Sequence, residues 1–149
     1  MKKVFVLLAL TFLGLASLNA QSAEKISSIL KSQKITFGQA SYLAAVGQGL
    51  VSDEDDFSKA FDALKANGEF SKKNQNDVIS LKEYCNLCMK TAGIGGGLFY
   101  SITKSPRYAF KELQAKQILP SYADPDFTLN GYEAMAILNG CLNLAEEKK

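Results

Sequence analysis

The chain has 149 residues, a formal net charge of +2 and no histidine. Without histidine it lacks the usual general base and the usual zinc ligand, and it holds no Ser-His-Asp or Cys-His arrangement of its own. Once Lys2 and Lys3 are set aside, the remaining basic residues only match the 15 acidic ones, and no clustered basic face is evident. We therefore expect no catalytic residues, no metal, no cofactor and no nucleic-acid partner.

Residues 1–20 are typical of a secretory signal peptide. Lys2 and Lys3 precede an apolar run over residues 4–18, and Ala20 is a small residue at a plausible cleavage point. The run is shorter than the ~20 residues of a membrane-spanning helix, which favours cleavage over an uncleaved anchor. We expect an exported protein, in the periplasm or on the outer surface of a bacterium, with no stable membrane span after cleavage.

The rest of the chain has the length of one domain and can bury its own apolar core. Residues 21–34 are a leading segment, in which Ile26, Ile29 and Leu30 would share one side of a short helix. Residues 35–145 are the predicted helical domain. Residues 146–149 form a charged tail.

The clearest helix signal covers residues 79–97. Ser80 is a good N-cap, and Glu83 follows three residues later, as in a capping box. Glycines at 93 and 95–97 end the helix. Side chains at helical spacing then predict one buried stripe, made of Tyr84, Leu87, Cys88, Thr91 and Ile94.

This pattern has two weaker copies. Forty-four residues earlier, Thr36 is the cap and Gln39 closes the box. Forty-eight residues later, Thr128 takes the cap position and Gly131 stands where the box needs an acid. The alignment makes Ile35, Ile79 and Phe127 equivalent. The predicted stripes are Ala40, Leu43, Ala44, Gly47 and Leu50 in the first copy and Tyr132, Met135, Ala136, Asn139 and Leu142 in the third.

A second type of helix also repeats, because residues 57–70 align with residues 106–119. Ser105 is a cap followed by a proline at the first helical position. The acidic run at residues 53–56 would start the earlier helix, because carboxylates are stabilised by the positive end of the helix dipole. A calcium site is the alternative interpretation of the run. However, the run lacks the alternating oxygen ligands and the central glycine of an EF-hand loop. An internal period of roughly 45 residues predicts stacked helical repeats.

The junction between repeats is apolar and aromatic. Residues 98–104 are expected to form a short strand or one turn of helix packed on the core. The preceding glycines at 93–97 resemble a phosphate-binding loop only superficially, because no Lys-Ser or Lys-Thr pair follows.

Three cysteines complete the candidate chemistry. Cys85 and Cys88 form a CxxC pair within a helix, whereas redox pairs sit at a helix start. An odd number of cysteines leaves at least one unpaired within the monomer. Core filling, a disulfide joining Cys85 or Cys88 to Cys141, and thiol catalysis all remain open.

The order of a short helix, a loop, a capped segment and a longer helix resembles S-layer homology (SLH) domains. Residues 57–94 and 105–142 look like two such units, with residues 35–50 as a preceding half. The family's cap arginine, which grips cell-wall glycan, is replaced by Phe37, Leu81 and Leu129, and the chain has no tryptophan. The resemblance implies an all-α bundle of two and a half tandem helix-loop-helix units more than it implies a ligand.

The sequence thus predicts a non-enzymatic binding or scaffolding module of the cell envelope, in contact with wall polysaccharide or an envelope protein. The candidate contact residues combine aromatic faces with one cation: Phe99, Tyr100, Arg107 and Tyr108. The alternative interpretation, which the sequence supports equally, is that these residues only pack together to close the junction between repeats. The alternatives are a thiol-disulfide active periplasmic protein using Cys85 and Cys88, and a purely structural subunit of an envelope assembly.

Overall fold

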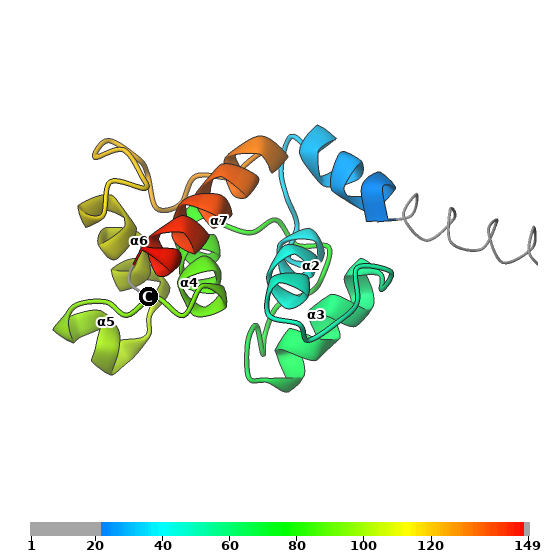
Figure 1. Ribbon diagram of the computed structural model, residues 1–149, viewed down its shortest axis with the longest axis horizontal. Helices are drawn as coiled ribbons and strands as arrows, with labels where there is room; N and C mark the ends of the chain where they lie inside the picture. The colour runs from blue at the N-terminus through cyan, green and yellow to red at the C-terminus, as the bar shows by residue number, and fades with distance from the viewer. Residues whose placement is uncertain (1–21, 148–149) are drawn as a thin grey trace, which may run out of the picture.

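In the computed structural model, residues 22–147 are described, and they fold into helices without a regular strand (Figure 1). The predicted signal peptide lies outside the described residues. A helix at residues 22–31 comes first, in the predicted leading segment. It is followed by α2 (Phe37–Gly47), α3 (Phe57–Ala66), α4 (Leu81–Thr91), α5 (Leu98–Thr103), α6 (Pro106–Ala115) and α7 (Gly131–Glu146). The all-α prediction is confirmed.

The predicted caps of the first two capped helices are confirmed. At the start of α2, the Thr36 amide donates to Gln39 Oε1 (3.1 Å), and the Gln39 amide donates to Thr36 Oγ1 (3.3 Å). At the start of α4, the Glu83 carboxylate accepts from both the Ser80 amide (3.1 Å) and the Ser80 hydroxyl (2.6 Å). Side chains thus hold backbone groups that a helix start would otherwise leave unpaired.

The predicted start of the third capped helix is wrong by two residues. The N-cap of α7 is Asn130, whose Oδ1 accepts from the Glu133 amide (3.0 Å) while Glu133 Oε2 accepts from the Asn130 amide (2.8 Å). The capping box is therefore present. Leu129, at 2% exposure, takes the buried place expected of Phe127, which is 53% exposed. The predicted third stripe shifts with it.

The helices before α4 and before α7 begin as predicted. Asp56 caps α3, and its Oδ1 accepts from the Lys59 amide (2.7 Å). Pro106 is the first residue of α6, after the N-cap Ser105. The aligned apolar positions are buried in both helices, as Ala60, Phe61 and Leu64 in α3 and Ala109, Phe110 and Leu113 in α6. Helix α2 packs chiefly on α3, and α4 chiefly on α6.

The segments leading into α2, α4 and α7 meet at the centre of the molecule; we call residues 35–37, 79–81 and 129–131 the cap segments. The Ile79 amide donates to Ile35 O (3.2 Å), and the Ile35 amide donates to Leu129 O (2.9 Å). The Leu81 amide donates to Phe127 O (2.8 Å), so the segments leading into α4 and α7 are joined too. The first cap segment thus pairs with both of the others, and the second also pairs with the residues just before the third.

Around this centre, α4 and α7 lie between two flanks. Figure 1 places α2 and α3 on one side and α5 and α6 on the other. The Tyr84 hydroxyl of α4 donates to Ala134 O of α7 (3.0 Å) within the buried core. The two long capped helices are therefore joined directly.

The segment at residues 98–104 forms a helix, α5, and not a strand. Gly93 has φ +65°, a left-handed conformation that ends α4 and that other residues adopt only with strain. Only Tyr100 of α5 is buried. Helix α5 therefore stands out from the core at one end of the molecule (Figure 1).

Candidate functional site

The four predicted contact residues do not form one surface. Phe99 is 64% exposed and stacks on Tyr108, with ring centroids 5.4 Å apart. Tyr100 is 1% exposed, and its hydroxyl donates to Asn86 Oδ1 (3.3 Å), so it belongs to the core. Burial raises the pKa of Tyr100 to about 12. Arg107 is exposed on α6. The predicted patch therefore reduces to one stacked aromatic pair near a cation.

All three cysteines are free thiols in the core. Cys85, Cys88 and Cys141 are each at most 1% exposed, so the predicted disulfide is absent from the structure. The structure does bring Cys88 of α4 beside Cys141 of α7, close enough for the Cys141 thiol to raise the pKa of Cys88. These side chains fill the contact between the two central helices.

Their surroundings oppose thiolate chemistry. Burial raises the pKa of Cys85 and of Cys88 well above the usual range, and the nearby Cys141 thiol acts in the same direction. A nucleophilic cysteine needs the opposite, a lowered pKa and access for its substrate. The CxxC pair therefore lies in an environment typical of packing residues.

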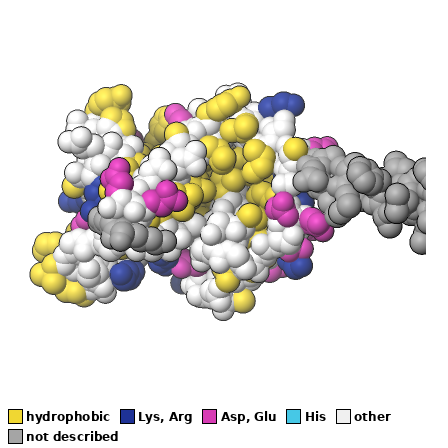
Figure 2. Space-filling model, viewed as in Figure 1, with side chains coloured by type: hydrophobic (Ala, Val, Ile, Leu, Met, Phe, Trp, Pro, Cys, Tyr) yellow, Lys and Arg dark blue, Asp and Glu magenta, His cyan; other side chains and the backbone are white. Residues whose placement is uncertain are grey.

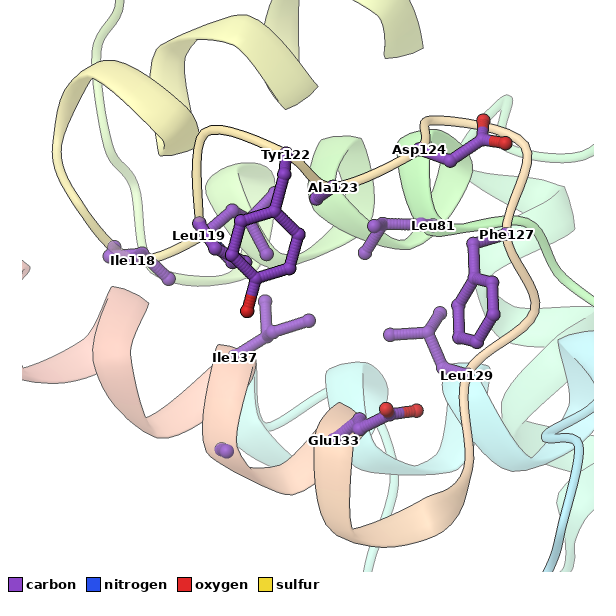
Figure 3. A pocket seen from close by; sticks show the side chains of 12 residues that line it. Leu81, Ile118, Leu119, Tyr122, Ala123, Asp124, Phe127, Leu129, Glu133 and Ile137 are labelled. Atoms are coloured by element: carbon purple, nitrogen blue, oxygen red, sulfur yellow. The ribbon is translucent and has the colours of Figure 1, made fainter.

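A strongly apolar cleft lies elsewhere, beside the loop between α6 and α7 (Figure 3). Its volume is about 490 Å³, within the range of ligand-binding pockets. Leu129 and Ile137 point into it, and Tyr122 and Phe127 stand at opposite sides. The lining residues are Leu81, Ile118, Leu119, Pro120, Tyr122, Ala123, Asp124, Phe127, Leu129, Glu133, Ala136 and Ile137.

The loop that forms one wall is held at both ends. Gln114 Nε2 donates to the carbonyl oxygens of Pro120 (3.2 Å) and Ser121 (3.1 Å), next to Tyr122. Farther along, the Lys82 amide donates to Pro125 O (2.9 Å), and the Lys82 ammonium pairs with the Asp126 carboxylate. The two aromatic walls are thus carried by backbone that is already ordered.

The cleft offers few polar groups. The Asp124 side chain points away from it in Figure 3, where its Oδ1 accepts from the Asp126 amide (2.9 Å). Glu133 lies at the rim, with Oε2 engaged by the Asn130 amide. Its other carboxylate oxygen is left for a ligand. An occupant would therefore be mainly apolar, with a donor or a cation at one edge.

The sequence did not reveal this cleft, because neither aromatic wall stood out as a site residue. The loop at residues 120–125 carries no cap or motif that singles out Tyr122, which is 88% exposed. Phe127 was expected in the core. The available signal was the pair of aromatic residues, Tyr122 and Phe127, in a short loop with two prolines. Two large aromatic side chains are unusual in a loop that only connects two helices through solvent.

A second hollow is smaller and charged. It measures about 260 Å³ and is lined by Lys72, Lys73 and Glu83 among others. Lys73 Nζ lies 2.8 Å from Glu83 Oε1, so these charges mainly satisfy each other. Burial of the Glu83 carboxyl raises its pKa, but hydrogen bonds from Lys73 and Ser80 outweigh it and the net pKa is lowered. The hollow is thus explained by its own ion pair.

The part of the chain that is described contains no cluster of His, Cys, Asp and Glu able to hold a metal ion. Likewise, none of its helices is long and apolar enough to span a membrane. In comparisons with protein-family models, curated proteins and solved structures, nothing matches this chain. Its function is therefore argued from the geometry of its own surfaces.

Proposed function

We propose that this protein is an exported, non-enzymatic binding module of the cell envelope, and that its cleft holds an apolar segment of an envelope protein. The observation that carries the proposal is the apolar cleft between two exposed aromatic side chains, Tyr122 and Phe127. Exposed aromatic and aliphatic side chains grouped around a pocket are typical of protein-binding surfaces. The export follows from the signal-like residues 1–20.

The composition of the cleft favours a protein segment over wall polysaccharide. A glycan presents many hydroxyl groups, and each needs a hydrogen-bond partner when it leaves water. This cleft supplies one rim carboxylate, Glu133, and a floor of Leu81, Leu129 and Ile137. An apolar side chain flanked by a lysine or arginine fits that combination. The resemblance to SLH units implied a fold more than a ligand, because the cap arginine that grips glycan in that family is replaced here.

The thiol-disulfide alternative has no support from the site geometry. Both CxxC thiols are buried and their pKa values are raised, so neither is an available nucleophile at neutral pH. A purely structural subunit of an envelope assembly would not require an open cleft between ordered aromatic walls.

The cleft is tested by filling it. Ala136 is exposed on α7 and lines the cleft, so Ala136→Trp should occupy it without disturbing the core. A photo-crosslinking amino acid at Tyr122 would be introduced into the protein in its own bacterium, and the adducts identified by mass spectrometry. We expect an adduct with an envelope protein that Ala136→Trp reduces at least tenfold. Asn139→Trp, exposed on the same helix outside the cleft, should leave it unchanged.

Two results would contradict the proposal. If the adduct forms equally with Ala136→Trp, the partner does not use the cleft. If instead the purified protein co-sediments with isolated wall polysaccharide and Ala136→Trp abolishes this, the ligand is a glycan and the choice of a protein segment is wrong.

A further inference from the structure

The exposed face of α5 is an apolar feature that the cleft does not use. Leu98 is 71% exposed, Phe99 is 64% exposed and Ile102 is 73% exposed. Three large apolar side chains on a helix of six residues are costly to leave in water, and such a group marks a contact surface. We call Leu98, Phe99 and Ile102 the α5 tip.

From its chemistry and its surroundings we infer that the α5 tip inserts into the surface of an anionic lipid bilayer. The protein would thereby attach peripherally to a membrane, independently of the cleft and of any membrane-spanning segment. Three features of the α5 tip favour insertion: the charge around it, the internal hydrogen bonds of its polar groups, and its position in the fold.

The charge around the tip is entirely positive along the chain. Between Glu83 and Glu112 the sequence contains four basic residues and no acidic one. Lys104, Arg107 and Lys111 are exposed, and among the described residues they form no ion pair. Figure 2 shows apolar side chains gathered over α5 at the lower left, with Lys and Arg side chains beside them. Cations next to an apolar tip complement the phosphates of anionic lipids.

Two acidic side chains near α5, Glu112 and Glu69, are already engaged within the protein, and Glu146 lines a hollow with Gly93 and Gly95 before the helix. Glu112 Oε1 accepts from the Gly97 amide at the start of the helix (2.7 Å). Glu69 pairs with Lys90, at 2.5 Å between Oε1 and Nζ. None of the three is a residue of the tip, so the repulsion between carboxylates and lipid phosphates would be small.

The polar groups of α5 are satisfied within the protein. The Ser101 hydroxyl donates to Gly96 O (3.0 Å), and the Thr103 hydroxyl donates to Phe99 O (2.8 Å). Groups that already have partners can enter a region of low water content at little cost, whereas unpaired ones cannot. A protein partner would instead be expected to find free hydroxyls to bond at the rim of its interface.

The position of α5 permits insertion. The helix lies at one end of the molecule in Figure 1, joined to α4 through a glycine-rich turn. Lys104 Nζ lies 4.9 Å from the centroid of the Tyr100 ring, which keeps this cation beside the tip. Phe99 is held by its stacking on Tyr108. The tip is thus a projection with an ordered base, and a projection suits a soft lipid surface better than a rigid groove.

The test uses tryptophan fluorescence, because the chain contains no tryptophan of its own. Phe99→Trp in the full chain reports on the tip alone. With vesicles of equal parts phosphatidylcholine and phosphatidylglycerol, we expect a blue shift of its emission and quenching by brominated acyl chains. With phosphatidylcholine alone we expect neither. Tyr132→Trp, 68% exposed on α7, is the matched control and should stay unquenched even if residues 1–20 also bind lipid.

The contributions of charge and apolar surface are then separated in the Phe99→Trp background. Lys104→Gln with Arg107→Gln should weaken vesicle binding roughly tenfold or more, since each basic residue near an anionic surface adds attraction. Leu98→Ser with Ile102→Ser should weaken it by at least about tenfold. Leu50→Ser, a partly exposed apolar residue outside α5, and Ala136→Trp in the cleft should have no effect.

The inference is overturned if Trp at position 99 remains in water with anionic vesicles, or if it inserts equally into phosphatidylcholine alone. It is also overturned if the same tryptophan is shielded only when a purified protein is added. Because Ala136→Trp leaves the expected vesicle binding intact, failure of the cleft proposal and failure of this one can be told apart.

Discussion

At the scale of single residues, Gly131 shows how closely the parts of this fold approach. A Cβ at this position would lie 1.9 Å from Ile29 O, which belongs to the helix at residues 22–31. The Gly131 amide donates to Ser32 O (3.0 Å) in the same region. The glycine thus lets the start of α7 meet the backbone that precedes α2.

We expect Gly131→Ala to lower the free energy of unfolding by about 2 kcal/mol or more, because the obstacle is backbone and cannot rotate away. Urea unfolding followed by circular dichroism measures this. Gly95→Ala is the control, since a Cβ there meets nothing within 4 Å. Equal stability of the two variants would show that the approach of residues 29 and 131 is not as close as described.

The buried thiols and Tyr84 make a second residue-scale prediction, on pH. Burial raises the pKa values of Tyr84, Cys85 and Cys88, so the folded state keeps protons that the unfolded chain releases. Stability should therefore be unaffected below the unfolded thiol pKa and should fall as the pH rises above about 8.5. Urea unfolding across that range measures it, and the fall should be smaller with Cys85→Ala and Cys88→Ala together.

Alkylation of the native protein checks the same thiols directly. At neutral pH we expect iodoacetamide to modify none of the three cysteines on the time scale in which it modifies the urea-unfolded chain completely. Rapid modification of one CxxC cysteine in the folded protein would restore the thiol-disulfide hypothesis.

At the scale of single helices, capping decides where each helix begins. Thr128 and Asn130 are both suitable cap residues, and they compete for the start of α7. Only Asn130 is followed three residues later by an acid, Glu133, which completes the capping box. With α7 starting after Asn130, Leu129 is buried in the core together with Ile35 and Ile79. The pairing with the other cap segments agrees with the same choice.

The competition predicts a difference between two alanine variants. Asn130→Ala should cost about 1 kcal/mol, because it removes the side-chain oxygen that accepts from the Glu133 amide at the start of α7. Thr128→Ala should cost much less, since its side chain caps nothing. Thermal unfolding of the two variants compares them. The reverse order would place the start of α7 where the sequence alignment with residues 79–81 put it.

At the scale of the whole molecule, the cap segments connect parts that are far apart in the chain. Ile35, Ile79 and Leu129 are almost fully buried. Backbone hydrogen bonds join Ile35 to both Ile79 and Leu129. In contrast, α5 contributes only Tyr100 to the core. Local opening should therefore be easiest at α5 and hardest at the cap segments.

Amide hydrogen exchange followed by NMR measures this difference. We expect the amides of Ile35, Ile79 and Leu81 to exchange among the slowest in the protein, and those of α5 to exchange at least about a hundredfold faster. Uniform protection across both regions would mean that the cap segments are not the centre on which the fold depends.

The sequence by itself determined most of the helices of this protein. Caps and apolar spacing act over about four residues, so Thr36, Ser80 and Ser105 could be identified without knowing any distant contact. The all-α class followed in the same way. The nature of the units as tandem SLH-like repeats remains a prediction.

Only the tertiary structure decided the register of α7, the burial of Cys85 and Cys141 and the site. Each depends on which side chains of distant segments fill the same space. Leu129 is preferred to Phe127 in the core because Ile35 and Ile79 are already there, and the displaced Phe127 becomes a wall of the cleft. Local patterns carry no information about that competition, because it is settled by packing between residues nearly a hundred positions apart.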